Sequence, residues 1–328
     1  MPRAAAPPVQ PAVPPKPIVT TTVFITHPSC LQHEMGPDHP ECPDRLTAIH
    51  DQLIASGLDP HLARREAPPA TPEQLARVHD RRYVAAIQAA APSSGLRYLD
   101  PDTALNPHSV DAALHAAGAV VHAVDLVCGG EYQTAFCAVR PPGHHAESRR
   151  AMGFCVFNNV AVGAAHAIAM HEIERVAIVD FDVHHGNGTE EMFSGDGRVL
   201  MVSTFQYPLY PYSGVENPAD NMVNVPLASG SGSTEFREAV REAWLPALDG
   251  FRPQLIIFSA GFDAHVEDDM AMLRFADADY GWVTEQLQPL AERFAEGRMV
   301  SLLEGGYALS ALGRSAVQHI KVLAGLNA

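Results

Sequence analysis

The sequence predicts a single α/β domain built around a mostly parallel sheet, and three observations favour this class. Apolar, β-branched runs recur along the chain without polar interruption, as in strands that are covered on both faces. Alanine-rich, helix-like stretches stand between these runs, and such alternation is typical of layered α/β domains. No internal repeat or interdomain linker divides the 328 residues, so we expect one domain.

The apolar runs and the stretches between them place the expected elements. Strands are expected over residues 21–26, 134–139, 175–182, 199–204, 255–261 and 299–306. Helices are expected over residues 110–126, 158–171, 234–248 and 278–296. The N-terminal segment MPRAAAPPVQPAVPPKP is rich in proline and lacks the apolar centre of a signal peptide. It predicts a flexible tail over residues 1–18, ahead of one domain over residues 19–328.

Charge and cysteine usage narrow the class of protein. The net charge is −16, from 22 Lys+Arg and 38 Asp+Glu, which is the opposite of the basic footprint of a nucleic-acid binder. No apolar run approaches the roughly 18 residues of a membrane span, so no membrane contact is expected. The five cysteines form no C-x-x-C pair, which favours free thiols, a reducing compartment and a cytoplasmic location.

Polar, glycine-containing motifs follow four of the expected strands. They are VRPPGHHAE, DFDVHHGNG, SAGFDAH and LEGGY. Ligands bind at the carboxyl ends of the strands in open α/β sheets, so the four motifs predict one shared site.

Two of these motifs supply a candidate metal site. Asp180, Asp182 and His184 are spaced two apart, so they share a face if the strand continues through them. Asp182, His184 and Asp263 would give a divalent ion two carboxylates and one imidazole, with a position left for water or substrate. The alternative is structural: Asp182 caps the following loop and Asp263 pairs with an arginine.

The remaining motifs supply candidates for proton transfer and charge stabilisation. His144 and His145 could act as general acid and base because imidazole titrates near neutral pH. Tyr307 could donate to a carbonyl oxygen and to the oxyanion that develops from it. Together with a metal these residues indicate metal-assisted hydrolysis of an acyl bond, with no serine or cysteine nucleophile. Taken singly, each histidine or tyrosine could instead be structural.

Five motifs in order resemble the zinc-dependent histone deacetylase family, and most closely its class II-like bacterial amidohydrolases. They are RPPGHHAE, AMGFCVFNNVAVGA, DFDVHHGNGTEEMF, SAGFDAH and LEGGY. With GPDHPECPDRL near the start, the resemblance covers about residues 20 to 325. It implies the arginase–deacetylase fold, a single domain with a central, mostly parallel eight-stranded sheet flanked by helices. It also implies removal of acetyl or related acyl groups from acylated lysine side chains.

The resemblance implies roles for individual residues. Asp182, His184 and Asp263 match the ligands of one Zn²⁺, with Fe²⁺ as the alternative metal in the cell. His145 matches the general base, with His144 chiefly electrostatic, and Tyr307 matches the transition-state tyrosine. Asp180 would orient His144, and Asn187 stands where class I members carry an aspartate beside the other histidine, which would bias His145 less toward its charged form.

Further positions concern the substrate and a second ion. Gly153 and Phe154, with Tyr210 opposite, resemble the walls of an acyl-lysine tunnel. Arg45 resembles the arginine that lines the family's internal acetate channel. A structural K⁺ is implied behind the zinc, held largely by backbone oxygens of Asp180, Asp182, His184, Ser203 and Thr204.

One loop departs from the family pattern and leaves the substrate open. The usual FDAHRGDPLG reads FDAHVEDDMA here, with Met270 at the substrate-binding rim. Met270 is not the acidic gatekeeper of a polyamine-selective member, although the net charge would suit a cationic polyamine. An acetylpolyamine amidohydrolase and an inactive acyl-lysine binder therefore stay as alternatives, and a homo-oligomer stays open. A binuclear ureohydrolase would need a carboxylate at Gly186.

Overall fold

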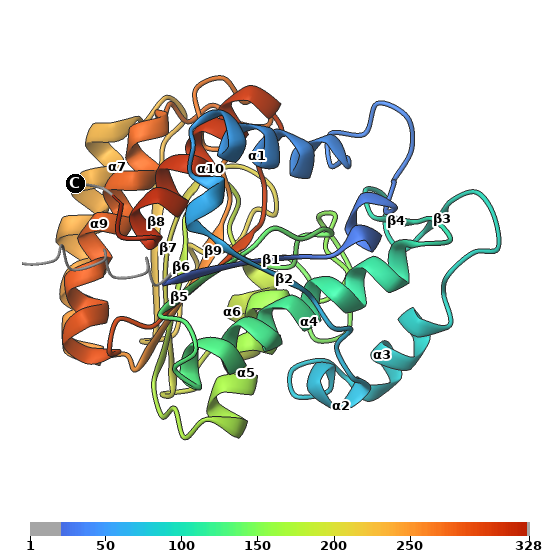
Figure 1. Cartoon of the computed structure of the whole chain (residues 1–328), viewed down its shortest axis with the longest axis horizontal. Helices are drawn as coiled ribbons and strands as arrows, with labels where there is room; N and C mark the ends of the chain where they lie inside the picture. Colours follow the sequence, from blue (N-terminus) through green and yellow to red (C-terminus); the bar gives the residue numbers. More distant parts are fainter. Residues whose placement is uncertain (1–20, 327–328) are drawn as a thin grey trace, which may run out of the picture.

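The computed structural model describes residues 21–326 as one α/β domain (Figure 1). Eight strands form the central sheet in the order β2-β1-β5-β10-β9-β6-β7-β8, and every neighbouring pair is parallel. The predicted fold class is confirmed, with a sheet that is parallel throughout. The predicted tail over residues 1–18 lies outside the described residues. The strands are β1 Thr22–Thr26, β2 Ala63–Glu66, β5 Thr134–Cys137, β6 Val176–Asp180, β7 Val199–Gln206, β8 Met222–Leu227, β9 Leu255–Ala260 and β10 Met299–Leu303.

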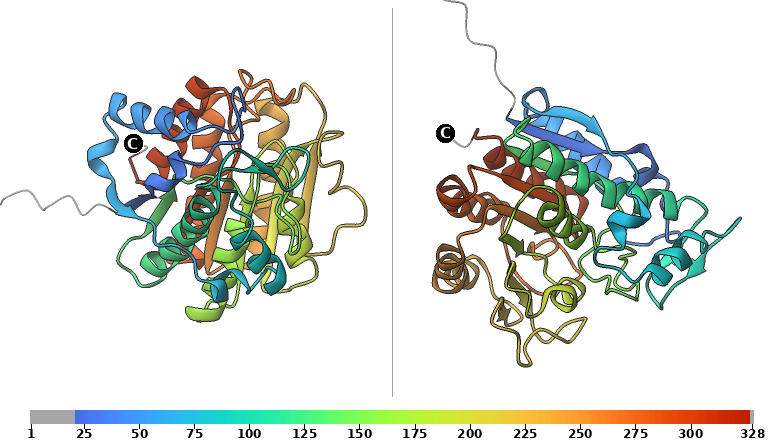
Figure 2. Two further views of the ribbon diagram at one scale, coloured as in Figure 1. Left: turned by 90° about the vertical axis from the view of Figure 1, so that its right-hand side faces the viewer. Right: turned by 90° about the horizontal axis from the view of Figure 1, so that it is seen from below.

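Helices cover both faces of the sheet (Figures 1 and 2). On one face α10 (Leu309–Leu323) packs between α1 (Asp44–Ala55) and α9 (Asp277–Phe294). On the other face α4 (Ser109–Cys128) packs against α5 (Asn159–Met170). The remaining α-helices and strands are α2 Pro72–Leu75, α3 Arg81–Gln88, the hairpin strands β3 Arg97–Tyr98 and β4 Ala104–Leu105, α6 Asn187–Phe193, α7 Ser233–Ala239 and α8 Leu245–Phe251.

The interior strands are apolar because both of their faces are covered. Every residue of β5, β6, β7, β9 and β10 is buried, whereas the edge strand β2 is mostly exposed. Helix α4 corrects the expectation that no apolar stretch reaches membrane-spanning length. By length and composition it could cross a membrane, but 78% of its most apolar window is buried, as in a core helix.

The strand order brings four loops together at one edge of the sheet. Strands β5, β10, β9 and β6 are consecutive neighbours, and each is followed by one of the four polar motifs. Their register keeps the carboxyl ends level: Leu302 lies beside Cys137, Leu303 beside Ala260, and Asp180 beside Ser259. The predicted convergence of the four strand ends is therefore confirmed.

Several predicted elements differ from the structure. The strands expected over 134–139 and 299–306 end at Cys137 and Leu303. The strand expected over 175–182 ends at Asp180, so Asp182 and His184 lie in the following loop and do not share a strand face. The helix expected over 234–248 is divided into α7, a π-helical turn over Val240–Trp244, and α8. Strands β2 and β8 and helices α1 and α10 were not predicted.

Candidate active site

The four loops surround a cavity of about 270 Å³ at the carboxyl edge of the sheet. Predicted site residues that line it are His144, His145, Gly153, Phe154, Asp182, His184, Tyr210, Met270 and Tyr307. The cavity is also lined by Asp102, Pro142, Cys155, Leu209 and Gly305, which were not predicted as site residues. Asp263, Asp180 and Asn187 lie behind this lining, in contact with its members.

Asp182, His184 and Asp263 bring one ligand atom each to a common point at the base of the cavity. The Nδ1 atom of His184 lies 3.0 Å from Asp182 Oδ1 and 3.3 Å from Asp263 Oδ2, and the three atoms lie within 4.8 Å of one another. All three residues are buried, and Asp263 Oδ2 has no hydrogen-bond partner among the described residues. An unpartnered buried carboxylate oxygen facing an imidazole nitrogen and a second carboxylate fits a divalent metal ion.

Carboxylates, not strand geometry, hold the loop after β6 in place. Asp180 Oδ1 accepts the Asp182 N–H over 3.1 Å, and Asp182 Oδ1 accepts the His184 N–H over 2.9 Å. Asp263 Oδ1 accepts the Val183 N–H over 2.9 Å. Each carboxylate therefore fixes the backbone of the loop through one oxygen. Asp263 turns its other oxygen, Oδ2, toward the shared point, whereas Asp180 Oδ2 faces His144.

Two glycines allow the strand ends to approach the carboxylates. Gly305 donates its N–H to Asp182 Oδ2 over 2.8 Å, and a Cβ on Gly305 would lie 2.0 Å from Asp263 Oδ2. A Cβ on Gly261 would lie 2.1 Å from Asp182 Oδ2. No side chain fits at either place, so the glycines of SAGFDAH and LEGGY are explained by contact with the ligand carboxylates.

The electrostatics of this group suit a cation. Burial, together with the charge of Asp182, raises the pKa of Asp263 to about 6. Burial would lower the pKa of His184, but the hydrogen bond to Asp182 and the nearby Asp263 carboxylate outweigh it and raise that pKa to about 10. Without another cation the two carboxylates thus retain a proton on His184, and a metal ion would replace that proton.

The two adjacent histidines are held in different states. His144 Nδ1 lies 3.0 Å from Asp180 Oδ2, and although burial opposes the charge, Asp182 and Asp180 raise the pKa of His144 well above its usual value. His145 Nδ1 lies 2.8 Å from Asn187 Oδ1, which is uncharged. Burial and the neighbours His144 and His184 lower the pKa of His145 well below its usual value. The two environments thus favour the charged form of His144 and the neutral form of His145.

Tyr307 lines the same cavity from the loop after β10. Its backbone N–H donates to Asp268 Oδ2 over 2.6 Å, and its ring meets Phe154 edge-on at 6.0 Å. Burial raises the pKa of Tyr307 well above its usual value, so the phenol keeps its proton and can donate it. Arg45 is buried behind Tyr307 and does not line the cavity.

Sequence reasoning missed two buried carboxylates that position these residues. Asp268 accepts the N–H groups of Tyr307 and Ala308. Glu304 Oε2 accepts the N–H groups of Gly143 and His144 over 2.6 and 3.1 Å, and burial raises its pKa to about 7. The available signal was that both residues are acidic and follow strands. Their hydrogen-bond partners are backbone N–H groups distant in sequence, so this signal did not reveal their role.

The residues predicted to hold a monovalent cation are brought to neighbouring strands. Asp180 pairs in register with Ser203, and the buried Thr204 hydroxyl has no hydrogen-bond partner among the described residues. The Ser203 carbonyl oxygen accepts a hydrogen bond from Trp244 Nε1 over 3.3 Å. The K⁺ site stays a prediction.

A second His/Asp cluster with metal-site spacing is already satisfied by hydrogen bonds. His166 Nε2 and His171 Nε2 both lie 2.7 Å from Asp125 Oδ1. Arg77 donates to His166 Nδ1 over 2.7 Å, so the ring proton must be on Nε2. A protonated Nε2 cannot ligate a metal, and this cluster is a hydrogen-bonded network.

Comparison with known proteins identifies the family. The model of the histone deacetylase domain matches residues 39–323. The chain belongs to the histone deacetylase family. It is 36% identical to a histone deacetylase-like amidohydrolase of Pseudomonas aeruginosa, over 93% of this chain and 87% of that protein. It is 35% identical to a probable deacetylase of Archaeoglobus fulgidus, over 94% and 88% of the two chains.

A solved structure of the same family agrees. The crystal structure of the HDA15 HD domain superposes with a TM-score of 0.88 at 36% sequence identity, covering 94% of this chain and 90% of that one. The predicted resemblance to the histone deacetylase family is therefore confirmed. Membership of this family supports a hydrolase that removes acetyl groups, with an acetylated substrate and a metal cofactor.

Proposed function

We propose that this histone deacetylase family member is a zinc-dependent amidohydrolase that removes acetyl or related acyl groups from lysine side chains. One observation carries the proposal: Asp182, His184 and Asp263 converge at the base of a cavity whose walls hold His145 and Tyr307. A cavity of about 270 Å³, with Phe154 and Tyr210 in its lining, suits an acylated alkyl chain.

Asp182, His184 and Asp263 would hold the metal. Bound there, Zn²⁺ supplies Lewis-acid polarisation of the acyl carbonyl and lowers the pKa of water, as two carboxylates and an imidazole commonly allow. Ferrous iron suits the same ligands, so the metal used in the cell is to be measured. A K⁺ behind the group, near Ser203 and Thr204, is part of the proposal.

His145 would act as the general base. Its low pKa leaves the ring neutral, so it can take a proton from the attacking water and later return it to the leaving amine. The amide oxygen of Asn187 fixes the ring orientation through Nδ1, which leaves Nε2 for the transferred proton. His144, charged and paired with Asp180, would stabilise negative charge beside the reacting carbonyl.

Tyr307 would donate its hydroxyl proton to the carbonyl oxygen as that oxygen becomes an oxyanion. Burial keeps the phenol protonated through the working pH range. Asp268 and Arg45 hold the backbone on either side of the tyrosine, so the donor is in place before the substrate arrives.

The test is hydrolysis of an acetyl-lysine peptide by the protein as purified, after chelation, and after return of zinc or iron. We expect activity to be lost with the metal and restored with it. Tyr307→Phe should lower kcat while a hydroxamate inhibitor still binds, and Asp263→Asn should lose metal. A chelated protein that keeps full activity would overturn the proposal.

An acetylpolyamine amidohydrolase is the second candidate, and it rests on the excess of acidic residues. Against it, Met270 lines the cavity where an acid would contact a cationic amine. The same assay with an N-acetylated polyamine separates the two. An inactive acyl-lysine binder would bind the peptide but never release acetate.

A further inference from the structure

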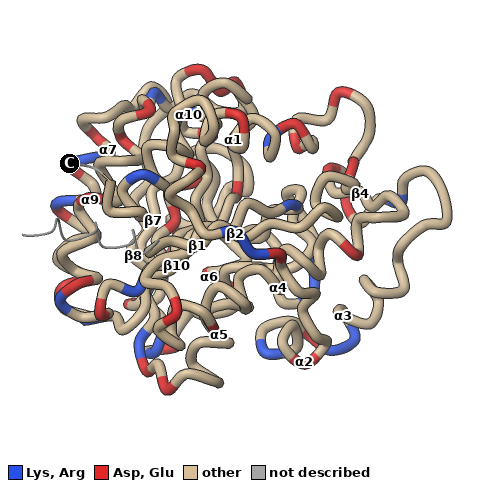
Figure 3. The backbone as a smooth tube through the Cα atoms, viewed as in Figure 1, with Lys and Arg blue, Asp and Glu red and all other residues tan. Residues whose placement is uncertain are grey.

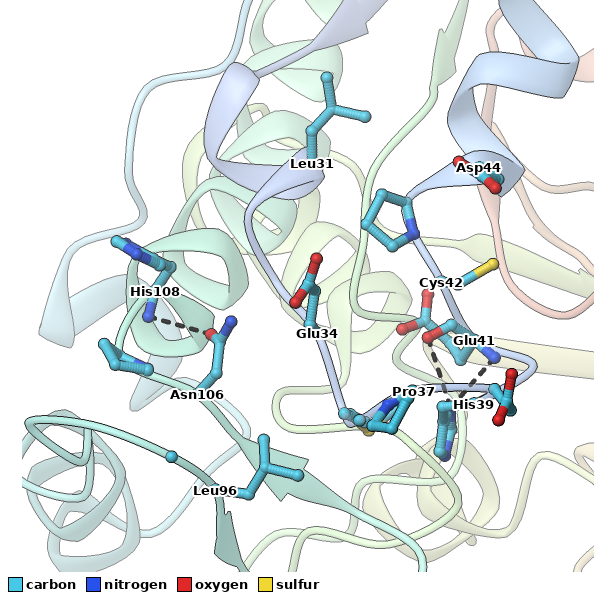
Figure 4. A pocket seen from close by; sticks show the side chains of 16 residues that line it. Leu31, Glu34, Pro37, His39, Glu41, Cys42, Asp44, Leu96, Asn106 and His108 are labelled. Atoms are coloured by element: carbon cyan, nitrogen blue, oxygen red, sulfur yellow. Dashed lines mark hydrogen bonds between the residues drawn. The ribbon is translucent and has the colours of Figure 1, made fainter.

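A groove of about 990 Å³ lies beside the catalytic cavity, which measures about 270 Å³ (Figure 4). Residues 31–44, between β1 and α1, form one wall, and residues 95–96 and 106–108, around the β3–β4 hairpin, form the other. The groove adjoins the catalytic cavity, because the ring of His39 meets that of Phe154 edge-on at 4.8 Å and Phe154 lines that cavity.

The groove is largely apolar and leaves two leucines open to solvent. Leu31 is 47% exposed and Leu96 is 37% exposed. Met35, Pro37, Pro43 and Pro107 complete the apolar lining. Solvent-exposed leucines in a concave surface mark a place where burial by another molecule is favourable.

The exposed charges of the groove are negative and unpaired. Glu34, Asp38 and Asp44 are exposed and make no hydrogen bond or ion pair with any residue of the described chain. None of the described residues that line the groove is Lys or Arg. Glu41, at the inner wall, is different: it is buried and its charge is neutralised by Arg140 and Arg45. Acidic residues are spread widely over the molecule (Figure 3). The inference therefore depends on the three unpaired carboxylates beside the catalytic cavity, Glu34, Asp38 and Asp44.

We propose that the groove binds a basic peptide segment that flanks the acylated lysine of a protein substrate. The inference rests on the proposed function, since it assumes that the acylated lysine occupies the adjoining cavity. Charge complementarity calls for Lys or Arg side chains on the ligand. The volume of the groove and its exposed leucines also require an occupant with bulky apolar groups or long side-chain stems. A peptide has such groups, and a thin polyamine lacks them.

The test uses two matched acetyl-lysine peptides, one with arginines on both sides of the acetyl-lysine and one with neutral citrulline at the same positions. The parent protein is compared with the triple variant Glu34→Gln, Asp38→Asn, Asp44→Asn. The control triple variant, Glu238→Gln, Glu242→Gln, Asp220→Asn, removes the same charge from exposed positions outside the groove. Steady-state kinetics are measured at low and high salt. Anisotropy of a labelled arginine peptide without acetyl-lysine reports binding independently of turnover.

We expect the parent and the control variant to prefer the arginine peptide about fivefold to tenfold, chiefly in KM and less at high salt. The groove variant should lose that preference with kcat unchanged, and it should bind the labelled peptide correspondingly more weakly. Equal use of both peptides by the parent would overturn the inference. So would a preference for acetylated polyamine that disappears in the groove variant. Groove-dependent peptide binding without hydrolysis would support the inference and count against the proposed function alone.

Discussion

The guanidinium of Arg45 lies over the ring of Tyr307, with its central carbon 4.8 Å from the ring centroid. The same group donates from Nε to the Gly306 carbonyl oxygen over 2.7 Å, and its terminal nitrogens reach the Glu304 carbonyl oxygen and the Glu41 carboxylate. One fully buried cation therefore holds the backbone that carries Tyr307 and contacts its ring. This makes Arg45 a positioning residue for the tyrosine, independently of its predicted place in an acetate channel.

Arg45→Lys should disturb this arrangement although it keeps the charge. Lysine cannot donate to two carbonyl oxygens and a carboxylate in one plane, so buried acceptors lose their partners. We expect the free energy of unfolding to fall by about 2–4 kcal/mol and kcat to fall about tenfold or more. Urea unfolding and steady-state kinetics measure the two effects. Arg293→Lys, at an exposed pair with Asp249, is the control and should change neither; an unaltered kcat in the Arg45 variant would contradict the positioning role.

Asn187→Asp should move the pH dependence of the reaction. A carboxylate placed 2.8 Å from His145 Nδ1 favours the charged ring and raises the pKa of His145. A general base works only when neutral, so the acidic limb of the kcat/KM profile should shift to higher pH, by about one unit. Asn187→Ala removes the hydrogen bond without adding charge, and it should lower kcat/KM without that shift. An unchanged acidic limb in the aspartate variant would exclude His145 as the base.

Gly305→Ala should abolish metal binding with little change elsewhere. The added Cβ would lie 2.0 Å from Asp263 Oδ2 and 2.6 Å from Asp182 Oδ2, so both carboxylates must leave the shared point. We expect less than one tenth of the parent's metal content, measured by mass spectrometry of the purified protein, and loss of activity that added zinc does not restore. Gly250→Ala is the control, because a Cβ there meets nothing within 4 Å. Full metal content in the Gly305 variant would place the metal elsewhere.

The interior of the fold was predictable because burial on both faces leaves a plain apolar pattern. Strands such as LIIFSA in β9 are buried at every position. The edge strand β2, with the sequence ARRE, has no such pattern, since its backbone pairs with β1 while its side chains meet solvent. Strand β8 contains Pro226 and is buried only at its two ends, Met222 and Leu227, so composition alone does not separate it from a loop.

Most residues of the site could be named from the sequence, but the contacts that hold them in place could not. Motifs at strand ends indicated that Asp182, His184 and Asp263 would meet, and they do. The reason given, a strand face shared with Asp180, was wrong, because carboxylate-to-backbone hydrogen bonds shape that loop. Asp268 and Glu304 could not be assigned, since their partners are N–H groups on other loops, and only the folded sheet order brings them together.

His79 anchors the loops around the two catalytic candidates from outside the cavity. It is buried, and its Nε2 accepts the Asn158 N–H over 2.9 Å. Its Nδ1 lies 3.1 Å from the Glu147 carbonyl oxygen and donates to it. Asn158 in turn caps α5 and donates to the Ala146 carbonyl oxygen over 3.2 Å. Both ring nitrogens of His79 are therefore used by the neutral form, and a second proton would break the bond to Asn158.

Acid should destabilise the protein through this residue. Burial lowers the pKa of His79 from 6.5 to about 4 in the folded chain, so the unfolded chain binds the proton first as the pH falls. The contribution is complete above pH 6.5 and is lost between about pH 6.5 and 4, by at most about 3 kcal/mol. His79→Gln should be less stable at pH 7 but lose less stability across that window, measured by urea unfolding at half-unit steps. His50→Gln, at an exposed histidine, controls for the loss of an imidazole. Parallel pH curves for the parent and the His79 variant would show that this proton is not linked to folding.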